Sequence, residues 1–518
     1  MSLFRKFASV GGATMASRVL GFAREALIAA FLGAGPVADA FYAAFRFPNL
    51  FRRLFAEGAF NSAFVPLFSK ELETGGRAAA REFAEKILAV LITVLLLLSA
   101  VAMVFMPFLV GTIIAPAFAE NPEKFDLTVT LTRIMFPYLA AMSLVAMLSG
   151  ILNAFRKYFL AALAPVLLNV VLVSALLVAG YYDADQRTIG LTLGWGVFVS
   201  GILQFGLLIY GVRQQGFSLT LRMPSVSPPV KRLLVLAFPT AIAGGITQIN
   251  LLVGQIIASA QSGAIAMMNY ADRLMQLPLG IIGISIGVVL LPELSRALAA
   301  KNKQEVEMLQ NRSLEFGLGL TIPSAVGLFM IPLPLIALLY ERGAFDRETS
   351  EITANVLAAF AIGLPSFVLI KIFQPSFYAR EDMKTPMWFS GANAIINIVL
   401  SLLLFPIYGV MGLAVSTSIA GWINAVLLCG SLYKSRQFRV AQKTVRNIAL
   451  ICVASLAMAG ILYSGNQWLG QSLTDENLLV RLLSIGALIL VAALVYFAIV
   501  IATGALSRRE LRAALKRK

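Results

Sequence analysis

Fourteen apolar runs of 20 to 29 residues dominate this chain of 518 residues. A run of about 20 apolar residues lets a helix cross the roughly 30 Å hydrocarbon core of a bilayer. The chain is 59% hydrophobic and 13% charged, and a soluble domain of typical composition carries far less apolar surface. We therefore predict an all-α polytopic membrane protein with about 14 transmembrane helices. They lie near 7–32, 37–62, 87–114, 131–155, 158–180, 189–212, 232–258, 264–292, 314–340, 353–379, 385–406, 408–433, 445–464 and 479–504.

Basic residues fall mainly on one side of these spans. With the N-terminus placed inside, the inner segments hold 29 of the 42 Lys and Arg residues, the outer segments hold 5, and 8 lie within spans. An excess of basic residues marks cytoplasmic loops. The distribution predicts an even number of spans with both termini cytoplasmic, and it attributes the net charge of +16 to topology rather than to nucleic-acid binding.

The residue types present exclude several chemistries. The chain has no His, its Cys429 and Cys452 sit in apolar runs, and it contains neither a GxxxxGK[ST] motif nor a zinc-binding spacing. His-dependent catalysis and metal binding, a disulfide framework and a Walker-type ATP site are therefore not expected. We predict a protein without metal or cofactor that is not an enzyme, and any transport it performs is not powered by its own ATP hydrolysis.

An internal duplication is indicated by two weak matches at similar offsets. FVPLFSK at 64–70 resembles LLPELSR at 290–296, and the 13-residue step from Arg156 to Asn169 recurs from Arg380 to Asn393. A six-span unit predicts two parallel lobes around a central cavity, related by an axis along the membrane normal. The expected domains are an N-terminal lobe at 1–230 (spans 1–6), a C-terminal lobe at 231–440 (spans 7–12), and two additional spans with a basic cytoplasmic tail at 441–518.

Charged residues occur inside the first two spans, where each costs at least roughly 2.5–3.5 kcal/mol. Arg18, Gly21 and Glu25 share one helical face, and Arg24 lies about 100° away from Glu25. The second span carries a polar stripe, with Pro48 as a potential kink. Its members, with the charged residues that follow, are Asp39, Tyr42, Arg46, Asn49, Arg52, Arg53 and Glu57.

The eighth span carries a comparable stripe before Pro278, formed by Asn269, Asp272, Arg273 and Gln276. Arginine keeps its charge when buried and binds phosphate through two parallel hydrogen bonds. Arg18, Arg24 and Arg273, with Arg52 as a fourth candidate, therefore predict a cavity for an anionic, phosphorylated group. Candidate cavity or gate residues are Glu25, Arg46, Asn49, Arg53, Glu57, Asn269, Asp272 and Gln276.

The alternative to a binding site is mutual neutralisation of these charges. Arg24 with Glu25, Asp272 with Arg273, and Asp39 with Arg46 are the three candidate pairs. Three further cations have open roles. Arg53 is either a cavity or a cytoplasmic-edge residue, Lys371 either lines the cavity or extends to the interface, and Arg133 is expected to extend to the interface.

Three segments resemble the MurJ/MviN lipid II flippases, which share a superfamily with MATE multidrug exporters and polysaccharide-lipid flippases. The segments are SRVLGFARE at 17–25, ADAFYAAFRFPNLFRRLFAEGAFNSAFVP at 38–66 and YADRLMQLP at 270–278. The fourteen spans and the two extra C-terminal spans extend the resemblance across essentially the whole chain.

The resemblance implies a flippase that moves lipid II, the undecaprenyl-pyrophosphate-linked peptidoglycan precursor, from the inner to the outer leaflet of the bacterial cytoplasmic membrane. It implies that Arg18, Arg24 and Arg273 line the central cavity and that Asp39 and Arg52 are further substrate-binding positions. It also implies that the last two spans, at 445–504, hold the lipid tail. Expected partners are lipid II, membrane lipids and cell-wall synthesis proteins.

Two departures limit what the resemblance implies. Gln276 stands where some family members have an acidic residue, which removes any role for that carboxylate. Spans 7, 11 and 12 contain no acidic residue, so a sodium site is not carried over.

The competing functions are a MATE-type multidrug exporter, a flippase for another polyprenyl-linked polysaccharide, and a membrane enzyme or scaffold of wall synthesis. An exporter of organic cations should present an acidic or aromatic cavity, whereas this one is arginine-rich. Without an ATP site, the cycle is expected to run on substrate gradients, ions or the membrane potential.

Overall fold

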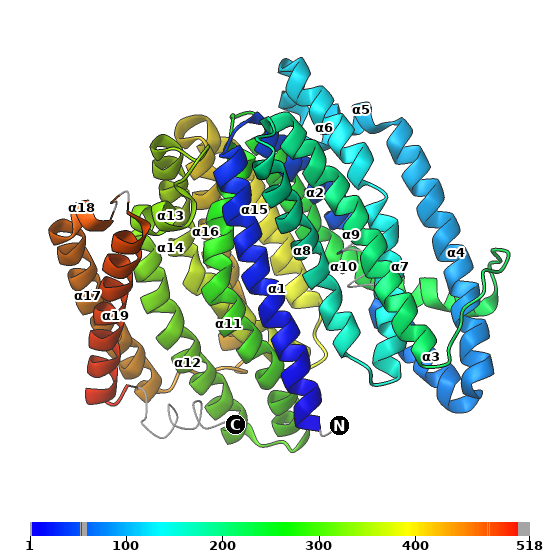
Figure 1. Ribbon diagram of the computed structural model, residues 1–518. Coiled ribbons are helices and arrows are strands. Elements are labelled where there is room, and N and C mark those ends of the chain that lie inside the picture. Colours follow the sequence, from blue (N-terminus) through cyan, green and yellow to red (C-terminus); the bar gives the residue numbers. More distant parts are fainter. Residues whose placement is uncertain (1–2, 52, 54–59, 474, 476, 506–518) are drawn as a thin grey trace. The chain divides into compact units, whose positions relative to one another are not determined.

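Helices form every regular element of the described part of the chain (Figure 1). In this computed structural model, the described residues are 3–51, 53, 60–473, 475 and 477–505. Unbroken apolar sequence favours helices here because only a helix satisfies its own backbone hydrogen bonds within a bilayer. The elements are α1 (Leu3–Leu32), α2 (Pro36–Phe51), α3 (Asn61–Thr74), α4 (Gly76–Val104), α5 (Met106–Leu109), η2 (Val110–Ile114), η3 (Pro116–Glu120), α6 (Pro122–Met135), α7 (Tyr138–Ala154), α8 (Phe159–Tyr181), α9 (Gln186–Gln214), α10 (Pro228–Ala258), α11 (Ala264–Ala299), α12 (Lys303–Met330), α13 (Pro332–Tyr340), α14 (Arg347–Tyr378), α15 (Lys384–Tyr408), α16 (Val410–Lys434), α17 (Gln442–Trp468), α18 (Gly470–Leu473) and α19 (Leu478–Ala502).

Ten helical segments among the described residues are long and apolar enough to cross a membrane. The chain is therefore a multi-pass, all-helical membrane protein, which confirms the predicted fold class. Three of the other four predicted spans correspond to α1, α10 and α11. The fourth, at 37–62, begins with α2, and its residues 52 and 54–59 lie outside the described residues. The charges of Arg18, Arg24 and Glu25 lower the hydropathy of α1, and α2 is described over Pro36–Phe51.

The contacts of the chain divide it into two units. Unit 1 comprises Met1–Ala266 with Gly343–Phe345, and unit 2 comprises Met267–Arg342 with Asp346–Lys518. In unit 1, α1 packs against α8, α2 against α6, and α10 against α3 and α4. These contacts place α10 in unit 1, whereas the predicted lobe boundary at 230/231 rests on the internal repeat and stays a prediction.

Unit 2 is built around α14, which packs against α12 and α16. The last two long helices, α17 and α19, lie side by side (Figure 1). They share an apolar core whose fully buried members include Ile451, Leu462, Ile485 and Val500.

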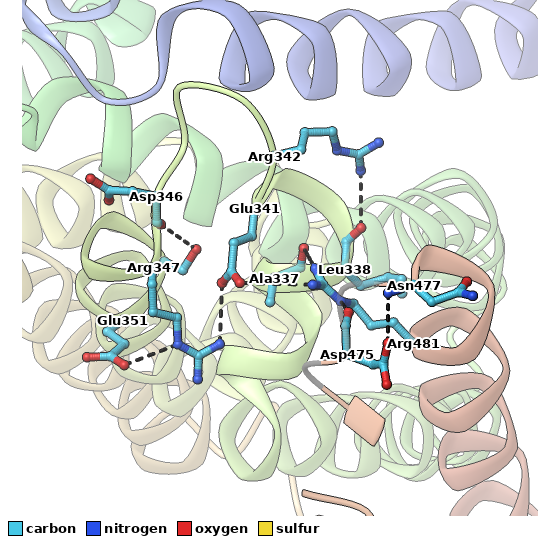
Figure 2. Close-up of polar contacts among 11 residues, drawn as sticks. Ala337, Leu338, Glu341, Arg342, Asp346, Arg347, Glu351, Asp475, Asn477 and Arg481 are labelled. Atoms are coloured by element: carbon cyan, nitrogen blue, oxygen red, sulfur yellow. Dashed lines mark hydrogen bonds and ion pairs between the residues drawn. The ribbon is translucent and has the colours of Figure 1, made fainter. Parts of the chain in front are cut away.

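A buried arginine fastens the start of α19 to α13. Arg481 donates from Nε to the Asp475 carbonyl oxygen and from Nη1 to the Ala337 carbonyl oxygen, each at 2.9 Å (Figure 2). Its Nη2 lies 4.0 Å from Glu341 Oε1. Nearby, burial and, to a smaller extent, the charge of Arg481 lower the pKa of Arg342. The Ala337 carbonyl near the end of α13 thus gains a charged donor from a residue 144 positions later in the sequence.

Candidate functional site

The polar face of α1 is organised around Arg24. Its side chain is buried, Nη1 donates to Asn169 Oδ1 of α8 at 3.0 Å, and Nη2 pairs with Glu25. Asn169 in turn donates from Nδ2 to the Ser17 carbonyl oxygen at 2.9 Å. The adjacent charges of Arg24 and Glu25 therefore neutralise each other, as one of the two sequence interpretations proposed, while Arg24 also reaches a neighbouring helix.

One guanidinium nitrogen of Arg24 is not used in this network. Among the described residues, the buried Nε atom has no hydrogen-bond acceptor. A buried donor without an acceptor costs about 1–3 kcal/mol. The Arg24 side chain is therefore held in place by two of its nitrogens, while the Nε donor is left without an acceptor among the described residues.

Glu25 connects α1 to α2. Tyr42 donates its hydroxyl hydrogen bond to Glu25 Oε2 at 2.6 Å, and both side chains are buried. Arg18, the other arginine of this helix that the sequence placed in the cavity, is exposed. Of the two arginines predicted on α1, Arg24 is thus held within the helix bundle and Arg18 is accessible.

Asp39 lies in a different environment from Arg24. Its carboxylate is fully buried and accepts from Lys124 Nζ at 2.7 Å, from the Gly263 backbone N–H at 2.7 Å and from the Ala266 backbone N–H at 3.1 Å. It therefore caps the start of α11, where backbone N–H groups have no partner within the helix. The ion pair of Asp39 is with Lys124 rather than with Arg46.

Lys124 is one of the five basic residues that the sequence interpretation counted in the outer segments. Its side chain is 8% exposed, and Nζ lies 3.8 Å from the centroid of the Phe118 ring. A cation over an aromatic face gains further stabilisation. Asp39, Lys124 and Phe118 therefore form a compact structural cluster within unit 1.

The rest of the second-span stripe is more accessible. Arg46 and Asn49 are half-buried, and Asn49 Nδ2 donates to the Phe45 carbonyl oxygen at 3.0 Å. Arg53 is exposed. Arg52 and Glu57 lie outside the described residues.

The eighth-span stripe lies on α11 in unit 2. Asn269, Asp272 and Arg273 are half-buried, and Gln276 is exposed and donates from Nε2 to Asp272 Oδ2. The helix runs without interruption through Pro278, so the four residues keep the common face that their spacing predicted.

The two isolated cations have defined positions. Lys371 is exposed on α14, next to Gly283 of α11. Arg133 donates from Nε to the Met103 carbonyl oxygen of α4 at 3.0 Å and is exposed. No group of three or more His, Cys, Asp or Glu side chains that could hold a metal ion occurs within the described ranges.

The sequence reasoning missed two contacts, that of Asn169 with Arg24 and that of Lys124 with Asp39. Asn169 was noticed only as a member of the repeat, although a lone amide in an apolar span is itself a signal of a buried polar partner. Lys124 follows Asn121, whose side chain caps α6, so its position resembles an ordinary loop-to-helix junction.

Comparison with known proteins identifies the family. A family model described as lipid II flippase MurJ matches residues 28–502. The chain belongs to the MurJ family. This confirms the resemblance expected from the three sequence segments.

Curated MurJ relatives match the chain over nearly its whole length. The probable lipid II flippase MurJ of Rhizobium tropici is 50% identical over 519 residues, covering 100% of this chain and 97% of that protein. The lipid II flippase MurJ of Burkholderia cenocepacia is 36% identical over 468 residues, covering 89% of this chain and 90% of that protein.

Solved structures agree with the MurJ assignment. A structure titled lipid II flippase MurJ, inward closed conformation, matches with a TM-score of 0.77 at 27% identity, covering 94% of this chain and 98% of that chain. An inward-facing multidrug resistance MATE transporter matches with a TM-score of 0.67 at 14% identity, covering 81% of this chain and 95% of that chain. The second similarity shows a shared fold alone.

Proposed function

We propose that this MurJ family member moves lipid II from the cytoplasmic to the periplasmic leaflet of the bacterial cytoplasmic membrane. The lipid II flippase names of its relatives, which align with 100% and 89% of the chain, support this substrate. The excess of basic residues in alternate loops supports cytoplasmic N- and C-termini. The protein acts as a transporter and performs no covalent chemistry on its cargo.

The observation that carries the proposal is the state of Arg24. Two nitrogens of its guanidinium are held by Asn169 and Glu25, while Nε, among the described residues, has no acceptor. A pyrophosphate oxygen supplies the missing acceptor and the negative charge that arginine favours. Arg24 is thus proposed as a positioned phosphate ligand, with accessible Arg18 as a second.

Arg273 of α11 is proposed as the third cationic ligand. In this proposal, Arg18, Arg24 and Arg273 contribute to one central cavity that opens alternately to the two sides of the membrane. Arg52 is proposed to join them. Asp39 is proposed to act on the substrate through the position of the α11 N-terminus, because its carboxylate is occupied by three donors.

The membrane potential is proposed to reset the transporter. Moving one charge through the potential is worth about 2.3 kcal/mol per 100 mV. The potential, negative inside, favours outward movement of the anionic headgroup and return of the empty, arginine-rich cavity to the inward-facing state. Collapse of the potential with valinomycin and potassium at a constant pH gradient should then slow the appearance of lipid II in the outer leaflet. An unchanged rate would eliminate this driving force without eliminating the flippase.

The function is tested by depleting the protein in cells and measuring which leaflet lipid II occupies. Wild-type protein should restore outer-leaflet lipid II, whereas Arg18→Ala, Arg24→Ala and Arg273→Ala should restore little at equal expression. Arg24→Lys should not rescue fully because a lysine lacks the planar donor set. Arg436→Ala, on an exposed connection between α16 and α17, is the control and should restore normal levels.

Two outcomes would contradict the assignment. Normal outer-leaflet lipid II in depleted cells would exclude this cargo. Depleted cells that instead lose export of cationic drugs would favour the MATE-type alternative. Normal flipping in all three alanine variants would remove the phosphate-binding role while leaving the flippase in place.

A further inference from the structure

A hollow between α4 and α10 is an apolar feature of unit 1 that the proposed transport does not use. Its volume is about 450 Å³. Among the described residues that line it, Ser143 of α7 is the only one with a polar side chain, and most of the others come from α4 and α10. The two facing stripes are Ile87, Val90, Leu91, Val94, Leu95 and Leu98 on α4, and Val230, Leu233, Leu234, Ala237 and Phe238 on α10.

The length of this groove matches one leaflet of a bilayer. The α4 positions advance in steps of three and one, so they form one face of the helix. From Ile87 to Leu98 the helix rises by about 16 Å at 1.5 Å per residue. Half of the hydrocarbon core is about 15 Å. A chain lying in the groove from its Ile87 end therefore stops close to the middle of the membrane.

The groove has a buried floor and an exposed rim. Ile87 and Val230 are each 2% exposed, whereas Val94 and Leu234 are each 55% exposed and Phe238 is 67% exposed. The rim is therefore both apolar and accessible. An apolar chain can therefore enter sideways from the bilayer and cover the floor.

The end of the groove near Ile87 and Val230 is basic. Lys86 precedes Ile87, and the exposed Lys231 and Arg232 follow Val230 directly. Lys86 is paired with Glu82 at 2.8 Å, so Lys231 and Arg232 provide the positive charge at this end. Basic side chains at the cytoplasmic surface attract anionic lipid headgroups.

The same end is held in place by a carboxylate clasp. Buried Glu85 of α4 accepts from Arg222 Nε at 2.6 Å, from the Thr220 hydroxyl at 2.7 Å and from Arg81 Nε at 2.9 Å. The clasp fixes the connection that leads into α10. Because two arginines already neutralise Glu85, it does not cancel the charge of Lys231 and Arg232.

We propose that this groove binds one acyl chain of an anionic glycerophospholipid from the cytoplasmic leaflet, with the lipid phosphate at Lys231 and Arg232. The apolar stripes hold the chain, the leaflet-length groove sets its depth, and the basic end selects the headgroup. This site lies in unit 1 and is distinct from the segment 445–504 that the family resemblance assigns to the lipid tail of the substrate. It does not depend on which cargo the protein moves.

Photo-crosslinking of the purified full-length protein tests the site. The probe is phosphatidylglycerol with a diazirine near the end of one acyl chain, and mass spectrometry identifies the labelled peptides. We expect labelling on α4 between 87 and 98 and on α10 between 230 and 238. Val94→Trp should fill the groove and abolish this labelling. Leu97→Trp is the matched control, because Leu97 is 66% exposed on the same helix but does not line the groove.

The headgroup is tested separately. Lys231→Gln and Arg232→Gln should each reduce labelling about fivefold, since a basic residue near a lipid surface contributes about that factor. Lys434→Gln, at the exposed end of α16, should leave labelling unchanged. A zwitterionic phosphatidylcholine probe should label the groove weakly.

Several results would overturn the proposal. They are labelling of wild-type protein confined to other helices, equal labelling by both probes, and unchanged labelling in Val94→Trp protein that migrates as a folded monodisperse species. Displacement of the phosphatidylglycerol probe by an equimolar amount of undecaprenyl phosphate would assign the groove to the polyprenyl tail of a substrate instead. If Val94→Trp does not fold, the peptide map of the wild type still decides the location.

Discussion

Replacing Asp39 with asparagine should destabilise unit 1 strongly. The carboxylate is fully buried and is the ion-pair partner of Lys124, whose side chain is 8% exposed. Removing one partner of a buried pair costs about 3–5 kcal/mol because the other charge stays buried. An asparagine Oδ1 atom can still accept from Gly263 or Ala266, and the Phe118 ring partly stabilises the lysine. We therefore expect the lower end of this range, about 3 kcal/mol.

The assay is thermal unfolding of the purified protein in detergent, followed by tryptophan fluorescence at a fixed heating rate. A loss of about 3 kcal/mol corresponds to a fall of roughly 6–12 °C in apparent Tm for a unit of this size. Asp126→Asn on α6 is the matched control. Its partner Arg187 lies at 3.6 Å and both side chains are more than half exposed, so about 0–1 kcal/mol is expected.

A double-mutant cycle separates the ion pair from other effects. Asp39→Asn combined with Lys124→Gln should be less destabilising than the sum of the single changes, with a coupling of about 0.5–3 kcal/mol. Additive effects, or an unchanged apparent Tm in Asp39→Asn, would refute the structural role. Loss of flipping at unchanged Tm would instead restore the direct substrate contact that the family resemblance implied.

Three further predictions follow from buried or capping side chains. Arg481→Met should lower the apparent Tm and speed amide exchange at 477–481, because the Asp475 and Ala337 carbonyls lose their charged donor. Arg481→Lys should recover only part of the lost stability. Equal stability of the wild type and both variants would contradict the anchoring role. Glu85→Gln should speed amide exchange at 215–222. Glu82→Gln, which loses only an exposed pair with Lys86, should leave exchange in this segment unchanged. Identical exchange in both variants would refute the role of Glu85 in holding this connection. Asp346 caps α14 by accepting from the Thr349 backbone N–H at 2.8 Å, and this bond holds the pKa of the carboxyl below its ordinary value of 3.8. The stabilisation of α14 by the Asp346 carboxylate is therefore present above pH 3.8 and is lost as the pH falls through the lowered pKa. In the wild type, protection from amide exchange at 347–351 should fall on acidification below about pH 4. In Asp346→Asn, which keeps an acceptor at the cap, this protection should not change with pH.

Sequence alone predicted the properties that depend on local physics. A bilayer requires long apolar helices, so the run lengths predicted an all-helical membrane protein before any contact was known. Helical periodicity likewise placed Asn269, Asp272, Arg273 and Gln276 on one face of a single helix, and the structure keeps them on α11. The segments at 17–25, 38–66 and 270–278 also predicted the family, which the match to the family model confirms.

Tertiary structure decided the partners of the buried charges. The adjacency of Arg24 and Glu25 was visible in the sequence, but their contacts with Asn169 and Tyr42 come from α8 and α2. Asp39 had a candidate partner in Arg46, about two turns later on the same helix. It pairs instead with Lys124, 85 positions later. Helical spacing reports which residues share a face, whereas the helix opposite that face is set by the whole fold. The pairing of a buried charge is therefore a non-local property, and so is the assignment of α10 to unit 1 through its contacts with α3 and α4.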